Sequence, residues 1–259
     1  MVSNVDIEKG LGKHIGIYPL EKDQIEGASI DLTASEYAFS VKKGCSVIKE
    51  GNIVIDPGDT VIVFTNESIS LDSHFVGACY NRISFSMKGL LHSSSPLKPN
   101  YTGRLSVTFF NASPVEVKVP VGDAIVVIMI HKLNSAATIT QGNGKGSRLD
   151  LLPSVGIMIQ DETIRKAITR YDDRKKLIEA MKESESYKII EQRRKKKKLK
   201  SLILFFSVFV MTGLFFALNI FKSDNYIVRW IYSTMGGIIS TVIGGLLLAF
   251  FQNQKLRSK

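Results

Sequence analysis

Residues 46–66 read SVIKEGNIVIDPGDTVIVFTN, and they decide the fold class of the first half of the chain. Apolar residues run or alternate over 46–55 and again over 60–66, a pattern typical of β-strands. The residues between these runs, Asp56-Pro57-Gly58-Asp59, are turn formers. The stretch therefore predicts two strands joined by a tight turn.

Short apolar runs and turn residues continue to alternate as far as residue 133. A second turn of the same kind lies at residues 120–123, PVGD. The chain is expected to open with a helix over residues 4–11, capped by Asn4. Many short strands with frequent turns favour a β-barrel or a β-sandwich. The further expected strands cover residues 29–32, 75–80, 105–111, 115–119 and 124–133.

The net charge of +10 over 259 residues is unevenly distributed. Lys+Arg and Asp+Glu number 14 and 15 over residues 1–160, 15 and 8 over 161–200, and 5 and 1 over 201–259. A nucleic-acid-binding domain would carry its positive charge on its folded part. We therefore exclude nucleic acid as the partner and interpret the basic segment as lying beside a lipid bilayer, where it attracts anionic lipid.

Two long apolar runs, 201–221 and 230–251, contain no charged residue. A helix rises about 1.5 Å per residue, so each run would span roughly 30 Å, the thickness of a hydrocarbon core. This predicts a transmembrane hairpin with helices at about 201–221 and 228–251; the alternative is a pair of buried core helices. Basic residues flank it at 193–198 and 255–259, which places both termini on the cytoplasmic side of the inner or plasma membrane.

Small residues repeat every four positions in the second run. Gly236, Ser240 and Gly244 would lie on one helix face and let two helices approach closely in lipid. The alternative is the ordinary abundance of glycine in membrane helices.

The predicted domains are a β domain over 1–150, a linker with a charged helical stalk over 151–200, and the hairpin over 201–259. The stalk would be either self-associating or a solvated single helix. The glycine-rich segment 142–148 is either the end of a linker or a loop that closes over phosphate. The spacing of the cysteines and histidines predicts neither a disulfide nor a metal site. These residues are Cys45, Cys79, His14, His74, His92 and His131.

Short motifs follow one another along residues 4–149. They read VDIEK (5–9), IGIYP (15–19), IEGASIDL (25–32), DPG (56–58), FVG (75–77), NRIS (81–84), GL (89–90), KPNYTG (98–103), Asn111, Gly122 and the loop 141–148. In this order and spacing they resemble the dCTP deaminase and dUTPase superfamily, nearer to the deaminase branch. The resemblance implies a dUTPase-like β-barrel or jelly roll that assembles as a homotrimer.

The residues that would activate water are absent at the matching positions. The deaminase branch uses the glutamate of an LExxN motif. Residues 107–111 match this motif but read VTFFN, so Thr108 stands where the glutamate would be. The dUTPase branch uses an aspartate, where this chain has Lys98. Threonine is no general base, and a lysine is normally protonated near neutral pH. The sequence therefore predicts no catalytic residue for either reaction.

The nucleotide-binding residues of the family have counterparts here. The resemblance implies that Arg82 and Ser84 contact phosphate and that Tyr101 lies against the sugar. Lys98 would add an anion contact, and Lys145 and Arg148 would belong to a loop that closes over the nucleotide. The alternative for Arg82 is an ion pair at a subunit interface. The chain is not expected to form a metal site of its own. Mg²⁺ is expected only in company with a bound nucleoside triphosphate.

The leading hypothesis is a catalytically inactive nucleotide-binding sensor coupled to a transmembrane effector, with antiphage defence by membrane disruption as its role. One alternative is a membrane-tethered active deaminase or triphosphate hydrolase. Another is a membrane scaffold with an empty domain.

Overall fold

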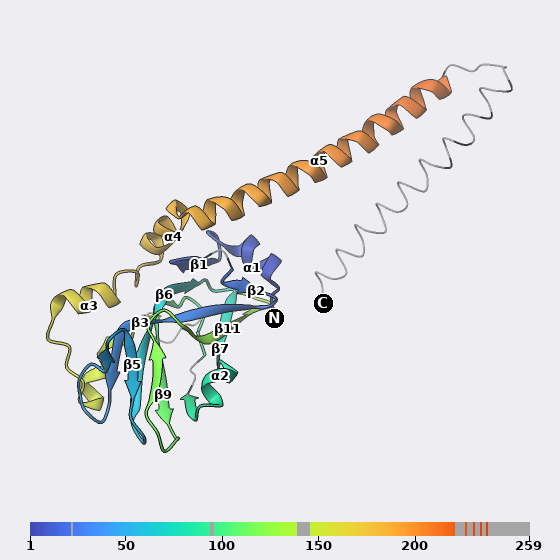
Figure 1. Cartoon of the computed structure of the whole chain (residues 1–259). Helices are drawn as coiled ribbons and strands as arrows, with labels where there is room; N and C mark the ends of the chain where they lie inside the picture. The colour runs from blue at the N-terminus through green and yellow to red at the C-terminus, as the bar shows by residue number, and fades with distance from the viewer. Residues whose placement is uncertain are drawn as a thin grey trace. The chain divides into compact units, whose positions relative to one another are not determined.

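The computed structural model describes residues 1–21, 23–93, 96–138 and 146–220, together with Tyr226, Trp230, Thr234 and Gly237; from 213 to 220 it describes only the helical backbone. Contacts divide the chain into two compact units, Met1–Glu191 and Gln192–Lys259. The first unit holds all the described strands, the α-helices α1 to α4 and the 3₁₀ helix η1 (Figure 1).

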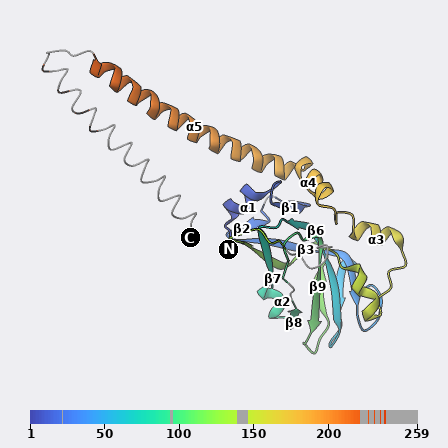
Figure 2. The same cartoon turned by 180° about the vertical axis from the view of Figure 1, so that it is seen from behind.

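The first unit is built on an eight-stranded antiparallel sheet, which Figure 2 shows from behind. Its main path runs β7-β11-β3-β6-β9-β8, with β1 beside β6 and β2 beside β3, and a second sheet has the order β10-β5-β4. The strands are β1 Ile15–Tyr18, β2 Ile25–Glu26, β3 Ser29–Ser40, β4 Ile48–Lys49, β5 Asn52–Ile55, β6 Thr60–Leu71, β7 Phe75–Asn81, β8 Leu90–Ser93, β9 Thr102–Asn111, β10 Val117–Pro120 and β11 Ala124–Lys132.

The two end strands of this path, β7 and β8, are joined by the short helix α2 (Ile83–Ser86). The amide of Asn81, the last residue of β7, donates to the carbonyl of Leu90, the first residue of β8, at 2.9 Å. The sheet is therefore nearly closed and barrel-like, and the predicted mainly β class is confirmed.

The two predicted turns form as expected. The N–H of Asp59 donates to the carbonyl of Asp56 at 3.1 Å, and that of Asp123 to the carbonyl of Pro120 at 3.2 Å. The single strand expected over 46–55 is instead the hairpin β4–β5, because Glu50 and Gly51 both take positive φ and turn the chain.

The opening helix α1 (Asn4–Gly10) is capped by Ser3 and not by Asn4. The Ser3 side chain accepts the N–H of Asp6, and its backbone has the extended conformation of a cap residue.

A continuous apolar core fills the first unit. Its largest fully buried side chains include Phe109 of β9 and a set of isoleucines and leucines from α1, β1, β3, β5 and β6. Each such side chain contributes about 1.5–3 kcal/mol of hydrophobic free energy. The core therefore fixes the strands that carry the predicted site residues.

The segment expected as a stalk packs on the barrel as far as Glu191. It contains the 3₁₀ helix η1 (Leu149–Val155), α3 (Glu162–Ile168) and α4 (Arg174–Glu183). Leu177 and Met181 of α4 are fully buried, and the N–H of Ile17 in β1 donates to the Met181 sulfur at 3.3 Å. The charged residues of α4 other than Arg174 are exposed, which is why the sequence resembled a solvated helix.

The long helix α5 (Glu185–Ile220) carries the polybasic run and all but the last residue of the first apolar run. Its large apolar side chains are exposed; Phe205 retains 73% and Phe209 67% of its surface. Within the described residues, no helix combines the length and the apolarity that a membrane crossing requires. The expected second span, including Gly236, Ser240 and Gly244, lies outside the described residues apart from Trp230, Thr234 and Gly237.

Candidate functional site

Arg82 stands between β7 and α2, where the sheet nearly closes. Its Nη1 donates to Oδ2 of Asp31 on β3 at 3.0 Å, and both side chains remain more than one-third exposed. Ser84, on α2, is exposed. The guanidinium is therefore held by an intramolecular carboxylate, and an incoming phosphate would compete with Asp31 for it.

Asn81 holds α2 in place. Its Nδ2 donates to Ser86 Oγ at 2.8 Å as well as to the carbonyl of Leu90. Its Oδ1 is buried and has no hydrogen-bond donor among the described residues. This amide therefore positions the segment that presents Arg82 and Ser84.

Thr108 lies in the middle of β9, paired with Ile62 of β6 and Ser93 of β8. It is partly buried. Lys98 is exposed in the turn before β9, which is closed by a hydrogen bond of 3.2 Å from the Tyr101 N–H to the Lys98 carbonyl. Asn100 takes the left-handed conformation in this turn, at φ 61°.

Tyr101 is partly buried and packs against the core. Its hydroxyl donates to the carbonyl of Arg104 at 2.7 Å. Burial raises the pKa of Tyr101, and the negative charge of Asp172 raises it further. The phenol is therefore a neutral hydrogen-bond donor already engaged within its own chain.

The described end of the glycine-rich segment docks on the start of β9. The N–H of Gly146 donates to the Thr102 carbonyl at 2.6 Å, and that of Ser147 to the Arg104 carbonyl at 2.7 Å. The Ser147 hydroxyl is buried and donates to Asp172 Oδ1 at 2.8 Å. This part of the segment is thus fixed to the barrel, and Lys145 lies outside the described residues.

Arg148 takes the left-handed conformation and forms a bidentate pair with Asp150, with both distances 3.1 Å. The hydrogen bonds to Asp150 raise the pKa of Arg148. The positive charge of Arg148 in turn acts on Tyr101, where it lowers the phenol pKa against the larger effect of burial. The predicted residues thus fall into two groups: Arg82 and Ser84 beside α2, and Lys98, Tyr101 and Arg148 around the start of β9.

Glu67 of β6 and Arg104 of β9 were not among the residues that the sequence motifs selected. Glu67 is 2% exposed, and its carboxylate accepts the N–H and the hydroxyl of Thr33, each at 2.8 Å. Burial raises the pKa of Glu67, while the hydrogen bonds from Thr33 and the charge of Arg104 oppose the rise. The one available signal was that Glu67 is the single charged residue of β6.

Arg104 stacks over the ring of Tyr37 at 5.4 Å and donates from Nη1 to the Thr65 carbonyl at 3.2 Å. Burial lowers the pKa of Arg104, and its Nε is buried with no acceptor among the described residues. The partly buried Arg104 of β9 thus acts electrostatically on the buried Glu67 of β6.

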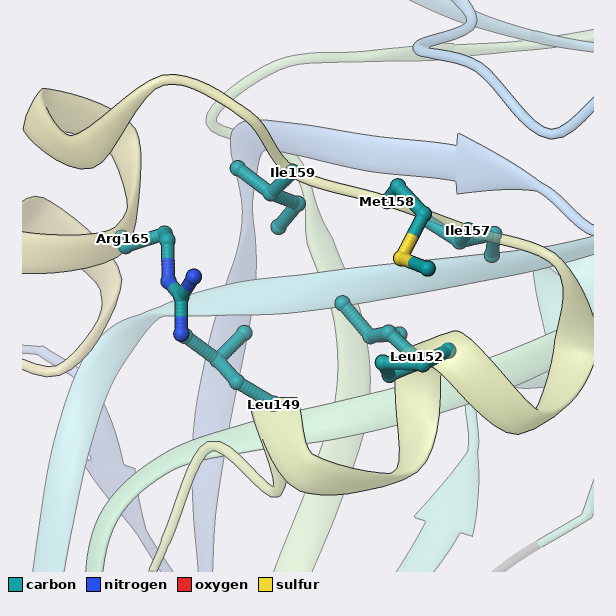
Figure 3. A pocket seen from close by; sticks show the side chains of 7 residues that line it. Leu149, Leu152, Ile157, Met158, Ile159 and Arg165 are labelled. Carbon is teal, nitrogen blue, oxygen red and sulfur yellow. The ribbon is translucent and has the colours of Figure 1, made fainter.

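A small apolar cavity of about 70 Å³ lies under η1, outside both groups of predicted residues (Figure 3). Leu149, Leu152 and Met158 line it, with Arg165 of α3 at one side. It has the volume of a few water molecules and no convergent polar groups. A nucleotide would not fit there.

Comparison with known proteins places the barrel in a family. The family model described as dCTP deaminase-like matches residues 1–133. The dCTP deaminase of Pyrococcus abyssi is 31% identical over 137 residues, covering 52% of this chain and 89% of that protein. The dUMP-forming dCTP deaminase of Methanopyrus kandleri is 27% identical over 171 residues, covering 56% and 89%.

A solved structure, the 2'-deoxycytidine 5'-triphosphate deaminase from Agrobacterium tumefaciens, matches with a TM-score of 0.43 and 16% identity. The match covers 51% of this chain and 48% of that one, so it spans about half of that structure.

The first unit is therefore a mainly β domain on a nearly closed, barrel-like sheet. The chain belongs to the dCTP deaminase-like family.

Proposed function

We propose that this chain is a nucleotide-binding protein that catalyses neither dCTP deamination nor dUTP hydrolysis. The observation that carries the proposal is the pair of residues at the expected base positions, Thr108 and Lys98. Deamination and phosphate hydrolysis both need a group that accepts a proton from water near neutral pH. Neither a threonine hydroxyl nor a protonated ammonium does so.

Binding is supported by the positive and aromatic groups that remain. Arg82 offers a guanidinium suited to bidentate contact with a phosphate. Around the start of β9, Lys98 is exposed beside the turn that leads to Tyr101, and Arg148 keeps half of its side chain exposed. The expected ligand is a nucleoside phosphate, bound with Mg²⁺ if it is a triphosphate, and the expected assembly is a homotrimer.

Ligand binding and turnover separate this proposal from its alternatives. The purified full chain is incubated with dCTP, dUTP, CTP or UTP, and the products are separated by chromatography while calorimetry measures binding. Binding without product supports the proposal. Turnover overturns it, and absence of binding to every nucleotide supports a scaffold with an empty domain.

The second part of the proposal is that residues 192–259 anchor the protein in the inner or plasma membrane. What supports it is the sequence of the runs 201–221 and 230–251, the basic flank at 193–198, and the exposed apolar side chains at the start of the first run. Small residues at Gly236, Ser240 and Gly244 would pack the helices of neighbouring copies.

Fractionation of cells expressing the chain tests the anchor. We expect the protein to stay with membranes after washing with alkaline carbonate, which removes peripheral proteins. A truncation at residue 191 is the matched control and should become soluble. Release of the full chain by carbonate would remove the anchor from the proposal.

The proposed consequence is an effector that changes membrane permeability when nucleotide binds, with antiphage defence as its role. The ligand must bind two states of the assembly with different affinity for this to occur. Membrane potential measured in cells before and after nucleotide supply tests it: depolarisation supports the effector, and an unchanged potential with nucleotide bound contradicts it.

A second candidate function is a membrane-tethered active deaminase or hydrolase. The observation that favours it is Glu67, a carboxylate whose pKa is raised by burial, as catalytic bases often require. Glu67→Gln would abolish turnover if this carboxylate were the base. Its 2% exposure and its two hydrogen bonds to Thr33 make it the weaker candidate.

A further inference from the structure

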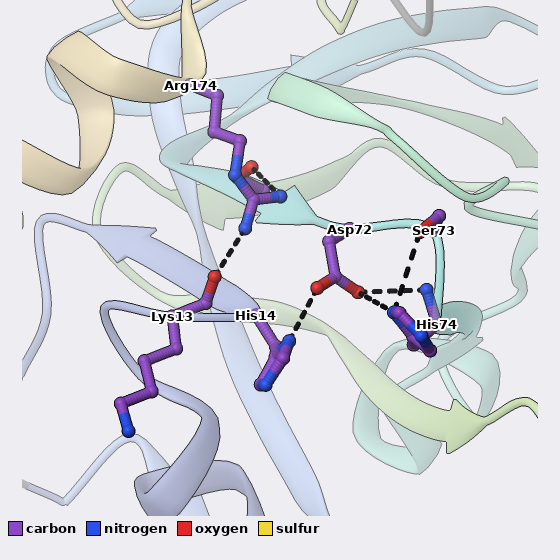
Figure 4. A network of polar contacts seen from close by, with 7 residues as sticks. Lys13, His14, Asp72, Ser73, His74 and Arg174 are labelled. Carbon is purple, nitrogen blue, oxygen red and sulfur yellow. Dashed lines mark hydrogen bonds and ion pairs between the residues drawn. The ribbon is translucent and has the colours of Figure 1, made fainter. Parts of the chain in front are cut away.

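His14 lies beside Asp72 and His74, although 58 positions of sequence separate it from Asp72 (Figure 4). Their ligand atoms all lie within 4.8 Å of one another. Nδ1 of His14 is 2.5 Å from Oδ2 of Asp72, and Nδ1 of His74 is 3.7 Å from Oδ1 of the same carboxylate. One carboxylate therefore stands between two imidazoles, each facing a different oxygen.

Strand register brings the three residues together. In the β1–β6 ladder Ile15 pairs with Leu71, so His14 and Asp72 are the next residues beyond its end. The N–H of Asp72 donates to the His14 carbonyl at 3.0 Å, which extends the ladder by one bond. The N–H of His74 donates to Asp72 Oδ1 at 2.9 Å and fixes the carboxylate toward the second imidazole. The backbone thus preorganises the cluster.

The side chains are open to ions from solution. The two imidazoles keep 47% and 46% of their surface exposed and the carboxylate 20%.

We propose that His14, Asp72 and His74 form a binding site for a divalent transition-metal ion of the zinc class. Two imidazole nitrogens and one carboxylate oxygen are ligands that Zn²⁺ takes in proteins, with a fourth position left to water. Imidazole ligands disfavour Mg²⁺ and Ca²⁺, which prefer oxygen. None of these three residues is among the proposed nucleotide contacts.

Metal binding requires a small rearrangement. In a tetrahedral site, ligand atoms about 2 Å from the ion lie roughly 3.3 Å apart. With Asp72 Oδ2 as the ligand oxygen, its separation from His14 Nδ1 must open by somewhat less than 1 Å, and the His74 ring, which faces Oδ1, must turn toward Oδ2. Each coordinating nitrogen must be free of its proton, which moves to the other ring nitrogen or to solvent. Rotation of the two exposed imidazole rings is sufficient for the change in distances between the ligand atoms.

The neighbours of the cluster indicate what a bound ion would hold together. Arg174, the first residue of α4, donates to the Lys13 carbonyl at 2.7 Å and contacts Ser70 Oγ at 3.4 Å. The Asp72 carbonyl accepts the N–H of Asn100, in the turn that carries Lys98, at 3.4 Å. A metal ion would thus clamp β1 to the β6–β7 turn, between α4 and the turn before β9. The charge of Arg174 reduces affinity for a dication, so we expect moderate affinity.

Metal titration of the purified full chain tests the site. The chain is stripped with a chelator and titrated with Zn²⁺ against a competing colorimetric indicator, with Co²⁺ as a spectroscopic probe. We expect one ion per chain, a visible tetrahedral Co²⁺ band, and a raised unfolding temperature. His74→Ala should weaken Zn²⁺ binding by roughly tenfold or more. It should also remove the Co²⁺ band.

His92→Gln is the matched control, because His92 lies in β8 away from the cluster. It should bind Zn²⁺ as the parent does. Asp72→Asn keeps a carbonyl oxygen for the His74 N–H and should also lose the ion, which separates ligation from folding. Equal Zn²⁺ affinity in parent and His74→Ala, or failure of the parent to bind Zn²⁺ or Co²⁺, overturns the proposal. A response to Mg²⁺ but not to Zn²⁺ overturns the assigned metal class.

Discussion

Gly103 and Gly146 pack against each other so closely that neither position has room for a Cβ. A Cβ on Gly146 would lie 2.5 Å from the Thr102 carbonyl and 2.7 Å from the Gly103 nitrogen. Gly103 also has a φ of +139°, which residues with a side chain rarely adopt. The docking of the glycine-rich segment on β9 therefore depends on glycine at both positions.

Replacing Gly103 by alanine should undock this segment. We expect Gly103→Ala to lower the free energy of unfolding by about 2–4 kcal/mol, since overpacking adds to the positive-φ cost. Gly122→Ala is the matched control, because Gly122 has a φ of +92° with open space around it. It should cost about 1 kcal/mol. Chemical denaturation measures both, and equal losses would show that the close approach is not stabilising.

The ion pair between Arg82 and Asp31 predicts a gain of nucleotide affinity on removing the carboxylate. Asp31→Asn should tighten binding by up to about fivefold, because a half-exposed pair is worth at most about 1 kcal/mol. Arg82→Ala should weaken it strongly. Calorimetry with a nucleoside triphosphate measures both, and Asp123→Asn controls for the change in net charge. Unchanged affinity in Arg82→Ala would make Arg82 purely structural.

Restoring a carboxylate at Thr108 should not restore deamination. Thr108 is partly buried between β6 and β8, so an added charge would cost about 1–3 kcal/mol of stability. We expect Thr108→Glu to remain inactive and less stable than Thr108→Gln. Chromatographic detection of deoxyuridine nucleotides measures activity. Clear turnover by Thr108→Glu would show that only the base is missing.

Glu67 predicts a pH dependence of stability. Because burial raises its pKa in the folded protein, the folded chain holds this proton at pH values where the unfolded chain has lost it. The free energy of unfolding should therefore fall as pH rises above the unfolded value of 4.5, by at most about 1.4 kcal/mol per pH unit, until the folded pKa is passed.

Glu67→Gln should abolish this fall, because a glutamine does not ionise and still offers an oxygen to the Thr33 N–H. Denaturation of parent and variant across a pH series measures the difference. The exposed Glu26→Gln should behave like the parent. A difference between parent and Glu67→Gln that stays constant with pH would contradict the prediction.

The local signals in the sequence were sufficient for the class of the first unit. The turn at Asp56–Asp59 depends on Pro57 and Gly58, residues whose backbone preferences act without tertiary help. The hairpin at Glu50-Gly51 was missed although Lys49-Glu50-Gly51-Asn52 interrupts the apolar run, because residues 46–55 were interpreted as one strand.

The packing of α4 and the His14–Asp72–His74 cluster could not be predicted, for two different reasons. Leu177 and Met181 are sparse among lysines and arginines, so their burial depends on a surface that the barrel provides. The cluster depends on the register of β1 against β6, which places residues 58 positions apart side by side. The spacing of these residues along the chain predicts neither the packing of α4 nor the cluster.

The near-closure of the sheet has a dynamic consequence at α2. Between β7 and β8 themselves, the described hydrogen bond comes from the side chain of Asn81, and beyond β8 a single backbone bridge joins Gly77 to Leu97. The contact between β7 and β8 should open locally before the rest of the barrel unfolds. Its amides should therefore exchange with deuterium first. Arg82 lies at this contact, so a phosphate bound to it would hold β7 and β8 together and slow amide exchange in both strands.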